Sequence, residues 1–202
     1  MAELSAESEA VAQCSDIEGW LTEDEARILY RHSAELGAHG PVLELGSFNG
    51  KSTVVLGLAA KSVGSRVVAV DPHQGINYWQ GDIPPLPHLG GPSFESFQRN
   101  LEAAGVDDVV EALVMTSVEA FDVTKCYDPF SFVFVDGNHG YEHVRQDFDL
   151  WSQRLITGGI IAFHDADGKI PGPPRVVAEV RERADFEPIS LVGQLASFRK
   201  IS

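Results

Sequence analysis

Short, nearly all-apolar runs recur along the chain, separated by segments whose apolar residues follow helical spacing. Runs of this kind are typical of strands that are covered on both faces of a parallel sheet. The pattern predicts such strands at residues 42–45, 66–70, 109–115, 132–135 and 159–163, with two further strands within 187–200. It predicts helices from about residue 22 to residue 37, and then at 51–61, 93–104, 141–155 and 174–183.

This alternation of strands and helices predicts an α/β fold. Consecutive strand–helix units build a parallel sheet, because each helix carries the chain back across one face. No helix separates the two closing strands, so an antiparallel last strand is expected. We therefore expect a doubly wound, mostly parallel seven-stranded sheet with helices on both faces. Residues 16–202 would form this single domain, whose N-terminal helix packs on its own sheet or on a partner in a homodimer.

The charge of the chain limits the partners that can be expected. The formal net charge is −15, which argues against nucleic acid because such a surface repels phosphate backbones. Residues 1–15 carry acids and no base, and they are predicted to form a disordered tail. No apolar run is long enough for a bilayer, and no secretory signal is visible, so no membrane partner is expected. Cys14 and Cys126 form no disulfide or metal pattern, which favours a cytoplasmic protein.

Two connections are too long to be simple links between elements. Residues 72–92 follow the second predicted strand, and residues 166–174 follow the fifth. Long loops in compact domains usually cover or line a ligand site. Both loops start at the carboxyl ends of strands, where open α/β sheets bind ligands. We expect loop 72–92 to be a lid in which Tyr78 and Trp79 form a flat apolar wall over a small-molecule acceptor.

A glycine-rich turn joins the first strand to the helix that follows it. Its sequence is Glu44-Leu45-Gly46-Ser47-Phe48-Asn49-Gly50-Lys51-Ser52. Glycine lets the backbone turn sharply beside a ligand, and free N–H groups at a helix start favour anions. A P-loop needs one more residue between its glycines, and a dinucleotide fingerprint needs glycine in place of Phe48. A P-loop kinase or NTPase that uses Lys51 and Ser52 stays open as an alternative.

Acidic and imidazole side chains follow three other strands. Asp71 ends the second strand, and a carboxylate about 20 residues past a glycine turn can accept hydrogen bonds from ribose hydroxyls. Asp136 and His139 follow the fourth strand, and His164 and Asp165 end the fifth. Carboxylates and imidazoles are ligands of divalent metals, and an imidazole also suits a general base. These residues predict a polar site at one edge of the sheet.

Together these elements resemble the class I S-adenosylmethionine-dependent methyltransferases, and in particular the small-molecule O-methyltransferases of the antibiotic-sugar type. The resemblance covers roughly residues 41–165 and rests on the acid-x-Gly-x-x-x-Gly turn, Asp71, Asp136-x-x-His139 and His164-Asp165. It implies that S-adenosyl-L-methionine binds along the strand ends. The implied cofactor-binding residues are Glu44, Gly46, Ser47, Asn49, Gly50, Ser52, Asp71, Ser117, Val118 and Asp136.

The same resemblance implies methyl transfer to a hydroxyl group, with His139 as the general base and Asp136 as a second catalytic residue. In metal-dependent members, Asp136, His164 and Asp165 would hold Mg²⁺ or another divalent metal. The pair at 164–165 is more often two acids or Asp-Asn, and an imidazole suits Mg²⁺ poorly, so metal use is left open. N- or C-methylation and a nucleoside-binding module without chemistry are further alternatives. The sequence does not identify the acceptor, because loops set substrate selectivity.

Overall fold

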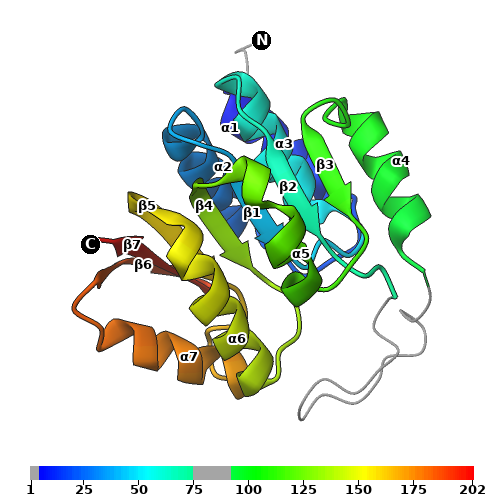
Figure 1. Ribbon diagram of the computed structural model, residues 1–202. Helices are drawn as coiled ribbons and strands as arrows, with labels where there is room; N and C mark the ends of the chain where they lie inside the picture. Colours follow the sequence, from blue (N-terminus) through cyan, green and yellow to red (C-terminus); the bar gives the residue numbers. More distant parts are fainter. Residues whose placement is uncertain (1–4, 75–91) are drawn as a thin grey trace.

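A seven-stranded sheet forms the centre of the computed structural model, which describes residues 5–74 and 92–202 (Figure 1). The strands are β1 (Val42–Leu45), β2 (Val67–Val70), β3 (Val110–Leu113), β4 (Phe130–Val135), β5 (Leu155–Phe163), β6 (Phe186–Val192) and β7 (Leu195–Lys200). The helices are α1 (Ala6–Ser15), α2 (Glu23–Gly37), α3 (Lys51–Ser62), α4 (Phe94–Ala104), α5 (Ser117–Val123), α6 (Tyr141–Trp151) and α7 (Gly172–Arg181).

The order of the strands across the sheet is β3-β2-β1-β4-β5-β7-β6. Strands β1 to β5 pair in parallel, whereas β7 runs antiparallel to both of its neighbours. This confirms the predicted doubly wound, mostly parallel sheet with an antiparallel last strand. The chain proceeds outward in opposite directions from β1 and β4. Ligands of open α/β sheets bind at such a reversal, beyond the carboxyl ends of the strands.

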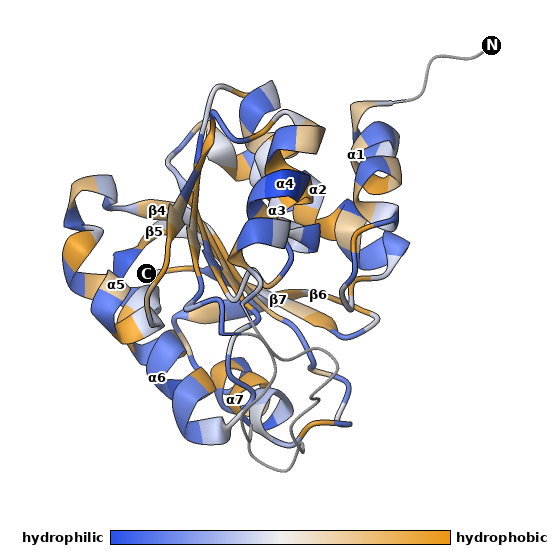
Figure 2. Cartoon of the chain, turned by 90° about the vertical axis from the view of Figure 1, so that its right-hand side faces the viewer, coloured by the Kyte–Doolittle hydropathy of each residue, from blue (hydrophilic) through white to orange (hydrophobic). Residues whose placement is uncertain are grey.

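Helices cover both faces of the sheet, as expected (Figures 1 and 2). Helices α1 to α4 pack on one face and α5 to α7 on the other. Successive residues of β1 show the alternation, since Val42 belongs to the first apolar cluster and Leu43 to the second. Glu44 therefore points to the same face as Val42, toward α3. None of the helices in the described part of the chain is long and apolar enough to cross a membrane.

Some element boundaries differ from the prediction. The predicted helix 141–155 ends at Trp151, and a 3₁₀ turn (Ser152–Arg154) leads directly into β5. Strand β5 therefore begins at Leu155, four residues before the predicted start. Helix α5 lies where no full helix was predicted, and Thr116 and Glu119 begin it with a reciprocal capping box. Such short segments carry too few apolar positions for a periodic signal.

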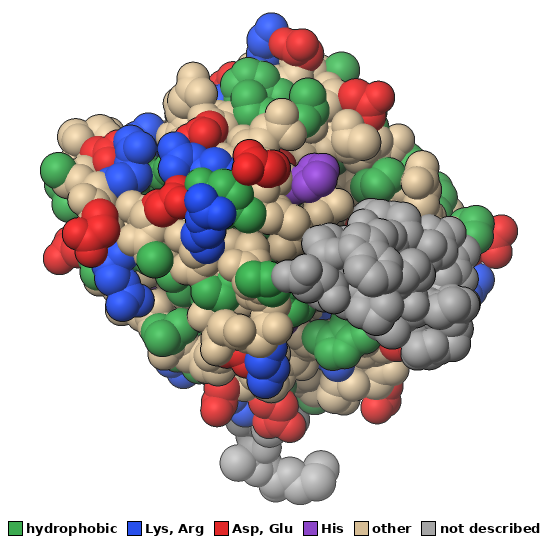
Figure 3. Space-filling view, turned by 90° about the horizontal axis from the view of Figure 1, so that it is seen from below, with side chains coloured by type: hydrophobic (Ala, Val, Ile, Leu, Met, Phe, Trp, Pro, Cys, Tyr) green, Lys and Arg blue, Asp and Glu red, His purple; other side chains and the backbone are tan. Residues whose placement is uncertain are grey.

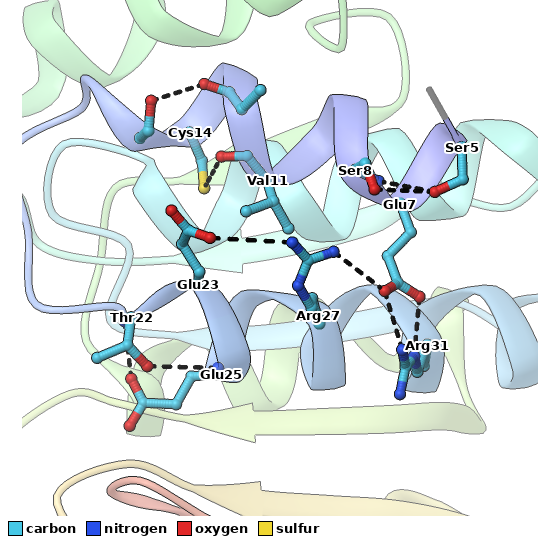
Figure 4. Close-up of polar contacts among 12 residues, drawn as sticks. Ser5, Glu7, Ser8, Val11, Cys14, Thr22, Glu23, Glu25, Arg27 and Arg31 are labelled. Carbon is cyan, nitrogen blue, oxygen red and sulfur yellow. Dashed lines mark hydrogen bonds and ion pairs between the residues drawn. The ribbon is translucent and has the colours of Figure 1, made fainter. Parts of the chain in front are cut away.

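The predicted disordered tail contains helix α1, so that prediction is wrong for residues 6–15. Ala10, Val11 and Cys14 are buried on one side of α1 and belong to the apolar cluster of α2 and α3. The carboxylate of Glu7 accepts hydrogen bonds from Arg27 and Arg31 of α2 (Figure 4). The amino-acid composition of this segment suggested disorder, because composition counts the acidic residues but does not show on which side of a helix they lie. The domain thus extends to α1 and does not begin at residue 16.

Candidate active site

A cavity of about 720 Å³ lies at the carboxyl ends of the central strands. Its wall comes from the segments that follow β1, β2, β3, β4 and β5, and from the connection between α1 and α2. Figure 3 shows the molecule from this side, where acidic, basic and apolar side chains are intermixed over the described part of the surface. The cavity therefore lies where the sheet topology predicts a ligand site.

The glycine turn after β1 packs against the backbone that follows β4. Gly46 has a φ of +91°, and a Cβ atom on it would lie 2.2 Å from the carbonyl oxygen of Asp136. Gly50, at the N-cap of α3, has a φ of +88°. Phe48 also adopts a positive φ of 45°, a conformation that is uncommon for residues with a side chain. Gly46 is thus required both for the turn and for the close approach to Asp136.

Glu44 lies beneath this turn and is completely buried. Its two carboxylate oxygens accept hydrogen bonds from the hydroxyl groups of Ser52 and Thr53 on α3. Complete burial raises the pKa of Glu44 to about 7, although these hydroxyl groups favour the charged form. Ser52 is part of the cavity wall, but Glu44 and Gly50 are not. Glu44 therefore supports the start of α3 from below the cavity.

Asp71 lines the cavity and also holds the glycine turn in place. Its Oδ2 accepts hydrogen bonds from the backbone N–H groups of Ser47 and Phe48, both at 2.8 Å. Its Oδ1 accepts one from the N–H of His73 at 2.6 Å. A carboxylate oxygen can accept two hydrogen bonds, so Oδ1 retains capacity for a ligand. The hydroxyl group of Ser47 is buried without a partner among the described residues, and it also lies on the cavity wall.

Three side chains meet where β4 and β5 end. Asp136 and Asp165 follow these strands, and His139 lies in the connection to α6. His139 Nε2 is 2.9 Å from Asp165 Oδ2 and 3.9 Å from Asp136 Oδ1. One potential ligand atom from each residue lies within 4.8 Å of the other two. We call Asp136, His139 and Asp165 the strand-end cluster.

The backbone around this cluster is fixed by close packing. Asp165 has a φ of +56°, which is strained for a residue with a side chain. A Cβ atom on Gly172, at the start of α7, would lie 2.0 Å from the carbonyl oxygen of His139. Among the described residues, neither ring nitrogen of His139 has a well-directed hydrogen bond, although both are buried. The backbone that carries the His139 imidazole is thus held in place beside the two acids.

The charges of the cluster depend on one another. Burial disfavours a charge on His139, but Asp136 and Asp165 outweigh it and raise the pKa of His139 to about 9. Burial also disfavours ionisation of Asp165, yet His139 and His164 hold the pKa of this carboxyl well below its usual range. The two carboxylates therefore favour positive charge beside them, and His139 and His164 both supply it in the protein alone.

His164 lies behind the cluster, with only 2% of its side chain exposed. Its Nδ1 is 3.3 Å from Asp136 Oδ1 and 3.4 Å from Asp165 Oδ2, while its Nε2 is 3.6 Å from Glu25 Oε2. Burial opposes protonation, but the surrounding carboxylates raise the pKa of His164 to about 12. On the sequence alone, His164 is grouped with Asp136 and Asp165 as a candidate metal ligand. In the structure, His139 is the histidine that lies in the cluster with these two acids. His164 is placed as a buried cation between three carboxylates.

Glu25 is the acid on the far side of His164, and it is completely buried. Its carboxylate accepts hydrogen bonds from the N–H groups of Thr22, at the start of α2, and Gln194, between β6 and β7 (Figure 4 shows Thr22). Burial opposes its ionisation, but His164 and these N–H groups lower the pKa of Glu25 to about 2. Glu25 is not identified from the sequence as a residue of the site. The structure shows that it also links α2 to the site.

Glu25→Gln is expected to destabilise the protein by about 1–3 kcal/mol, because glutamine leaves the buried charge of His164 less compensated. The matched control is Glu119→Gln, since Glu119 occupies the same capping-box position at the exposed start of α5. Urea unfolding of both variants gives the comparison. Equal midpoints for Glu25→Gln and the wild type would show that the contact with His164 contributes nothing to stability.

The structure brings most of the predicted site residues to the cavity. Its wall includes Gly46, Ser47, Asn49, Ser52, Asp71, Ser117, Val118, Asp136, His139, His164 and Asp165. Tyr78 and Trp79, predicted for the lid, lie outside the described residues. On the neighbouring helix α6, His143 also lines the cavity. Tyr141 does not line it, and its hydroxyl group donates a hydrogen bond to Glu179.

The cavity wall also contains residues that were not predicted, and three of them are polar or aromatic side chains of interest. Glu18 and Trp20 come from the connection between α1 and α2, and the Trp20 ring centroid lies 6.1 Å from that of Phe48. No motif marks this connection. Asp147 lies on α6 and gave a signal that could have been used, because it shares the buried and otherwise apolar face of that helix with Phe148 and Trp151. An acid at such a position is a sign of a polar role inside the fold.

Comparison with known proteins places the chain among methyltransferases. A family model described as a methyltransferase domain matches residues 43–166. The structure of the O-methyltransferase NovP has a TM-score of 0.73 at 18% identity, with 89% of this chain and 81% of that chain covered. The O-methyltransferase TomG from Streptomyces achromogenes, in complex with SAM, has a TM-score of 0.66 at 19% identity, with 100% and 92% covered. An O-methyltransferase from Bacillus cereus, in complex with SAH, gives 0.65 at 17% identity, with 99% and 93% covered.

Proposed function

The chain belongs to the methyltransferase-domain family, and on that premise we propose that it transfers a methyl group from S-adenosyl-L-methionine to a hydroxyl group of a small molecule. The observation that carries the proposal is the strand-end cluster. It places two carboxylates and an imidazole at one end of a cavity that also contains the glycine turn and Asp71. Structural neighbours with SAM or SAH bound, described as O-methyltransferases, support the choice of donor and acceptor group.

The methyl donor would lie between the glycine turn and Asp71. The ribose hydroxyls of the donor match the free capacity of Asp71 Oδ1 and the unpartnered hydroxyl of Ser47. Gly46 lets the turn lie directly against the backbone of Asp136, which keeps the turn and the strand-end cluster close together at the donor site. This arrangement would direct the sulfonium toward the strand-end cluster, where the acceptor has to bind.

The strand-end cluster also fits a divalent cation. The two carboxylates form a donor set suited to a hard divalent cation such as Mn²⁺ or Mg²⁺. One oxygen atom of Asp136 and one of Asp165 lie within 4.8 Å of each other, which supports this fit. Asp136 and Asp165 would hold the ion. When bound, it would orient the acceptor hydroxyl and lower its pKa.

His139 would serve as the general base. A bound cation would add positive charge beside Asp136 and Asp165, so that the imidazole of His139 would no longer have to be charged and could accept a proton. The other imidazole nearby, His164, has both nitrogens turned toward carboxylates. In the transfer step, the acceptor oxygen bonds to the methyl carbon, the carbon–sulfur bond breaks, and the hydroxyl proton moves to His139. Positioning of donor and acceptor in line supplies a large part of the rate.

A methyl-transfer assay tests this function. The protein is incubated with ¹³C-methyl-labelled donor and a panel of hydroxylated metabolites, with a chelator in one arm and added Mn²⁺ in another. NMR of the products is expected to show a methoxy group, whose formation stops with the chelator and resumes with Mn²⁺. Products that carry only N- or C-methyl groups would contradict the proposal of O-methylation. Full activity under chelation would contradict the metal-assisted step alone.

Asp71→Asn is expected to weaken binding of S-adenosylhomocysteine by roughly tenfold to a hundredfold, because charge-assisted hydrogen bonds to the turn and to the ribose are lost. Isothermal titration calorimetry measures this affinity. Asp107→Asn, which removes the same charge from an exposed site, serves as the control and is expected to bind normally. Unchanged affinity in Asp71→Asn would rule out its role in holding the donor.

A further inference from the structure

Asp147 is a buried acid on the wall of the cavity, and no basic side chain among the described residues pairs with it. Its exposed fraction is 6%, and it projects from α6. The Oδ1 atom accepts a hydrogen bond from the hydroxyl of Ser117, which itself accepts one from Trp151 Nε1 at 2.8 Å. No described group donates a hydrogen bond to Oδ2. Burial accordingly raises the pKa of Asp147 to about 6.

This arrangement differs from that of the other buried acids. Glu44 has both oxygens occupied by hydroxyl groups, and Glu25 has both occupied by N–H groups. Asp147 has one oxygen fixed by Ser117 and leaves the other at the cavity. Burying a carboxylate without partners is costly, so a ligand with an N–H donor would stabilise it. The neighbours Val144, Phe148 and Trp151 show that the helix face is otherwise apolar.

The position of Asp147 indicates which part of the methyl donor it meets. Its partner Ser117 follows β3, at one edge of the sheet, whereas the strand-end cluster follows β4 and β5. The reactive methyl group has to face that cluster. The opposite end of the donor, its purine base, then reaches the part of the cavity near Ser117. Val118, which is 47% exposed and lines the cavity, offers apolar surface for a flat ring.

We propose that Asp147, held in place by Ser117 and Trp151, accepts a hydrogen bond from the exocyclic amino group of adenine and thereby selects donors that carry this group. The proposal rests on the proposed function, since it assumes an adenosyl donor. The amino group at C6 is the sole N–H donor on the edge of an adenine base in a nucleoside. A carboxylate is an acceptor only, so the two groups are complementary. A purine with hydrogen at C6 would leave Oδ2 unpartnered.

The test compares the affinities of two ligands for each protein variant by calorimetry. The ligands are S-adenosylhomocysteine and its analogue with hydrogen in place of the C6 amino group. The wild type is expected to bind the first about tenfold to a hundredfold more tightly, because a hydrogen bond to a charged acceptor is lost with the analogue. In Asp147→Asn, the asparagine side chain has the same shape but presents an N–H₂ group or a weaker, uncharged acceptor. The ratio of the two ligand affinities is therefore expected to fall to about threefold or less.

Asp149→Asn is the matched control, because it removes an acid from the exposed side of the same helix. Its affinity ratio is expected to equal that of the wild type, and thermal melting checks that both variants fold. Ser117→Ala is expected to give an intermediate ratio, since Asp147 loses the group that orients it. The proposal is overturned if Asp147→Asn shows the same ratio of ligand affinities as the wild type. It is also overturned if the wild type binds both ligands equally well. If the wild type binds neither ligand, the proposed function itself fails.

Discussion

His139→Ala is expected to lower turnover by roughly 10²–10⁴-fold and to leave the affinity for S-adenosylhomocysteine almost unchanged. The imidazole belongs to the strand-end cluster, where it faces Asp165 at 2.9 Å, and it has no contact with the glycine turn or Asp71 among the interactions described. A base that acts on the acceptor proton affects the chemical step more than donor binding. The loss should therefore appear in kcat, with KM for the donor preserved.

Steady-state kinetics with the acceptor identified from the metabolite panel measure this effect. His143→Ala is the matched control, because His143 lies on the same cavity wall, in the first turn of α6, and is exposed. Its turnover is expected to fall much less. Wild-type turnover in His139→Ala would rule out the base assignment and would favour an amine or carbon acceptor, whose attack needs no such group.

Gly46→Ala is expected to destabilise the protein by roughly 4 kcal/mol or more and to remove measurable binding of S-adenosylhomocysteine. The added methyl group would lie 2.2 Å from the carbonyl oxygen of Asp136, which is backbone and cannot rotate away. Relief of this clash requires the turn and the end of β4 to separate. Since Asp136 belongs to the strand-end cluster, the change would affect donor binding and catalysis together.

Gly64→Ala separates the clash from the conformational cost. Gly64 also has a positive φ, of +71°, but an added Cβ would meet no atom within 4 Å. Its substitution is expected to cost only about 1 kcal/mol, because αL backbone is mildly unfavourable for alanine. Urea unfolding and calorimetry of both variants give the comparison. Similar stability of the two variants would mean that the close approach of Gly46 to Asp136 does not hold in solution.

The fold could be predicted from the sequence because its central strands are buried on both faces. Short, nearly all-apolar runs such as residues 42–45 and 132–135 are typical of strands in a covered parallel sheet. Helix α1 could not be predicted in the same way. It depends on Val11 and Cys14 packing against helices that come later in the chain, and on the pairing of Glu7 with two arginines of α2. These contacts become apparent only after the chain has folded.

The candidate site was predictable where its residues end strands, because parallel strands bring their carboxyl ends to one edge. This explains the agreement for Asp71, Asp136 and Asp165. The distinct placement of His139 and His164 was not predictable, since it depends on the side to which each imidazole turns. Glu25 and Asp147 were missed because they reach the site from helices, where spacing indicates packing and not chemistry.

Metal binding by the strand-end cluster tests the proposed site most directly. Mn²⁺ is titrated by calorimetry into the protein saturated with S-adenosylhomocysteine, and the same titration is made with Asp136→Asn and Asp165→Asn. We expect saturable binding of one ion per chain in the wild type and loss of that binding in both variants, because each removes a charged ligand. Absence of saturable binding in the wild type, or equal binding in the variants, would contradict a metal site at these residues.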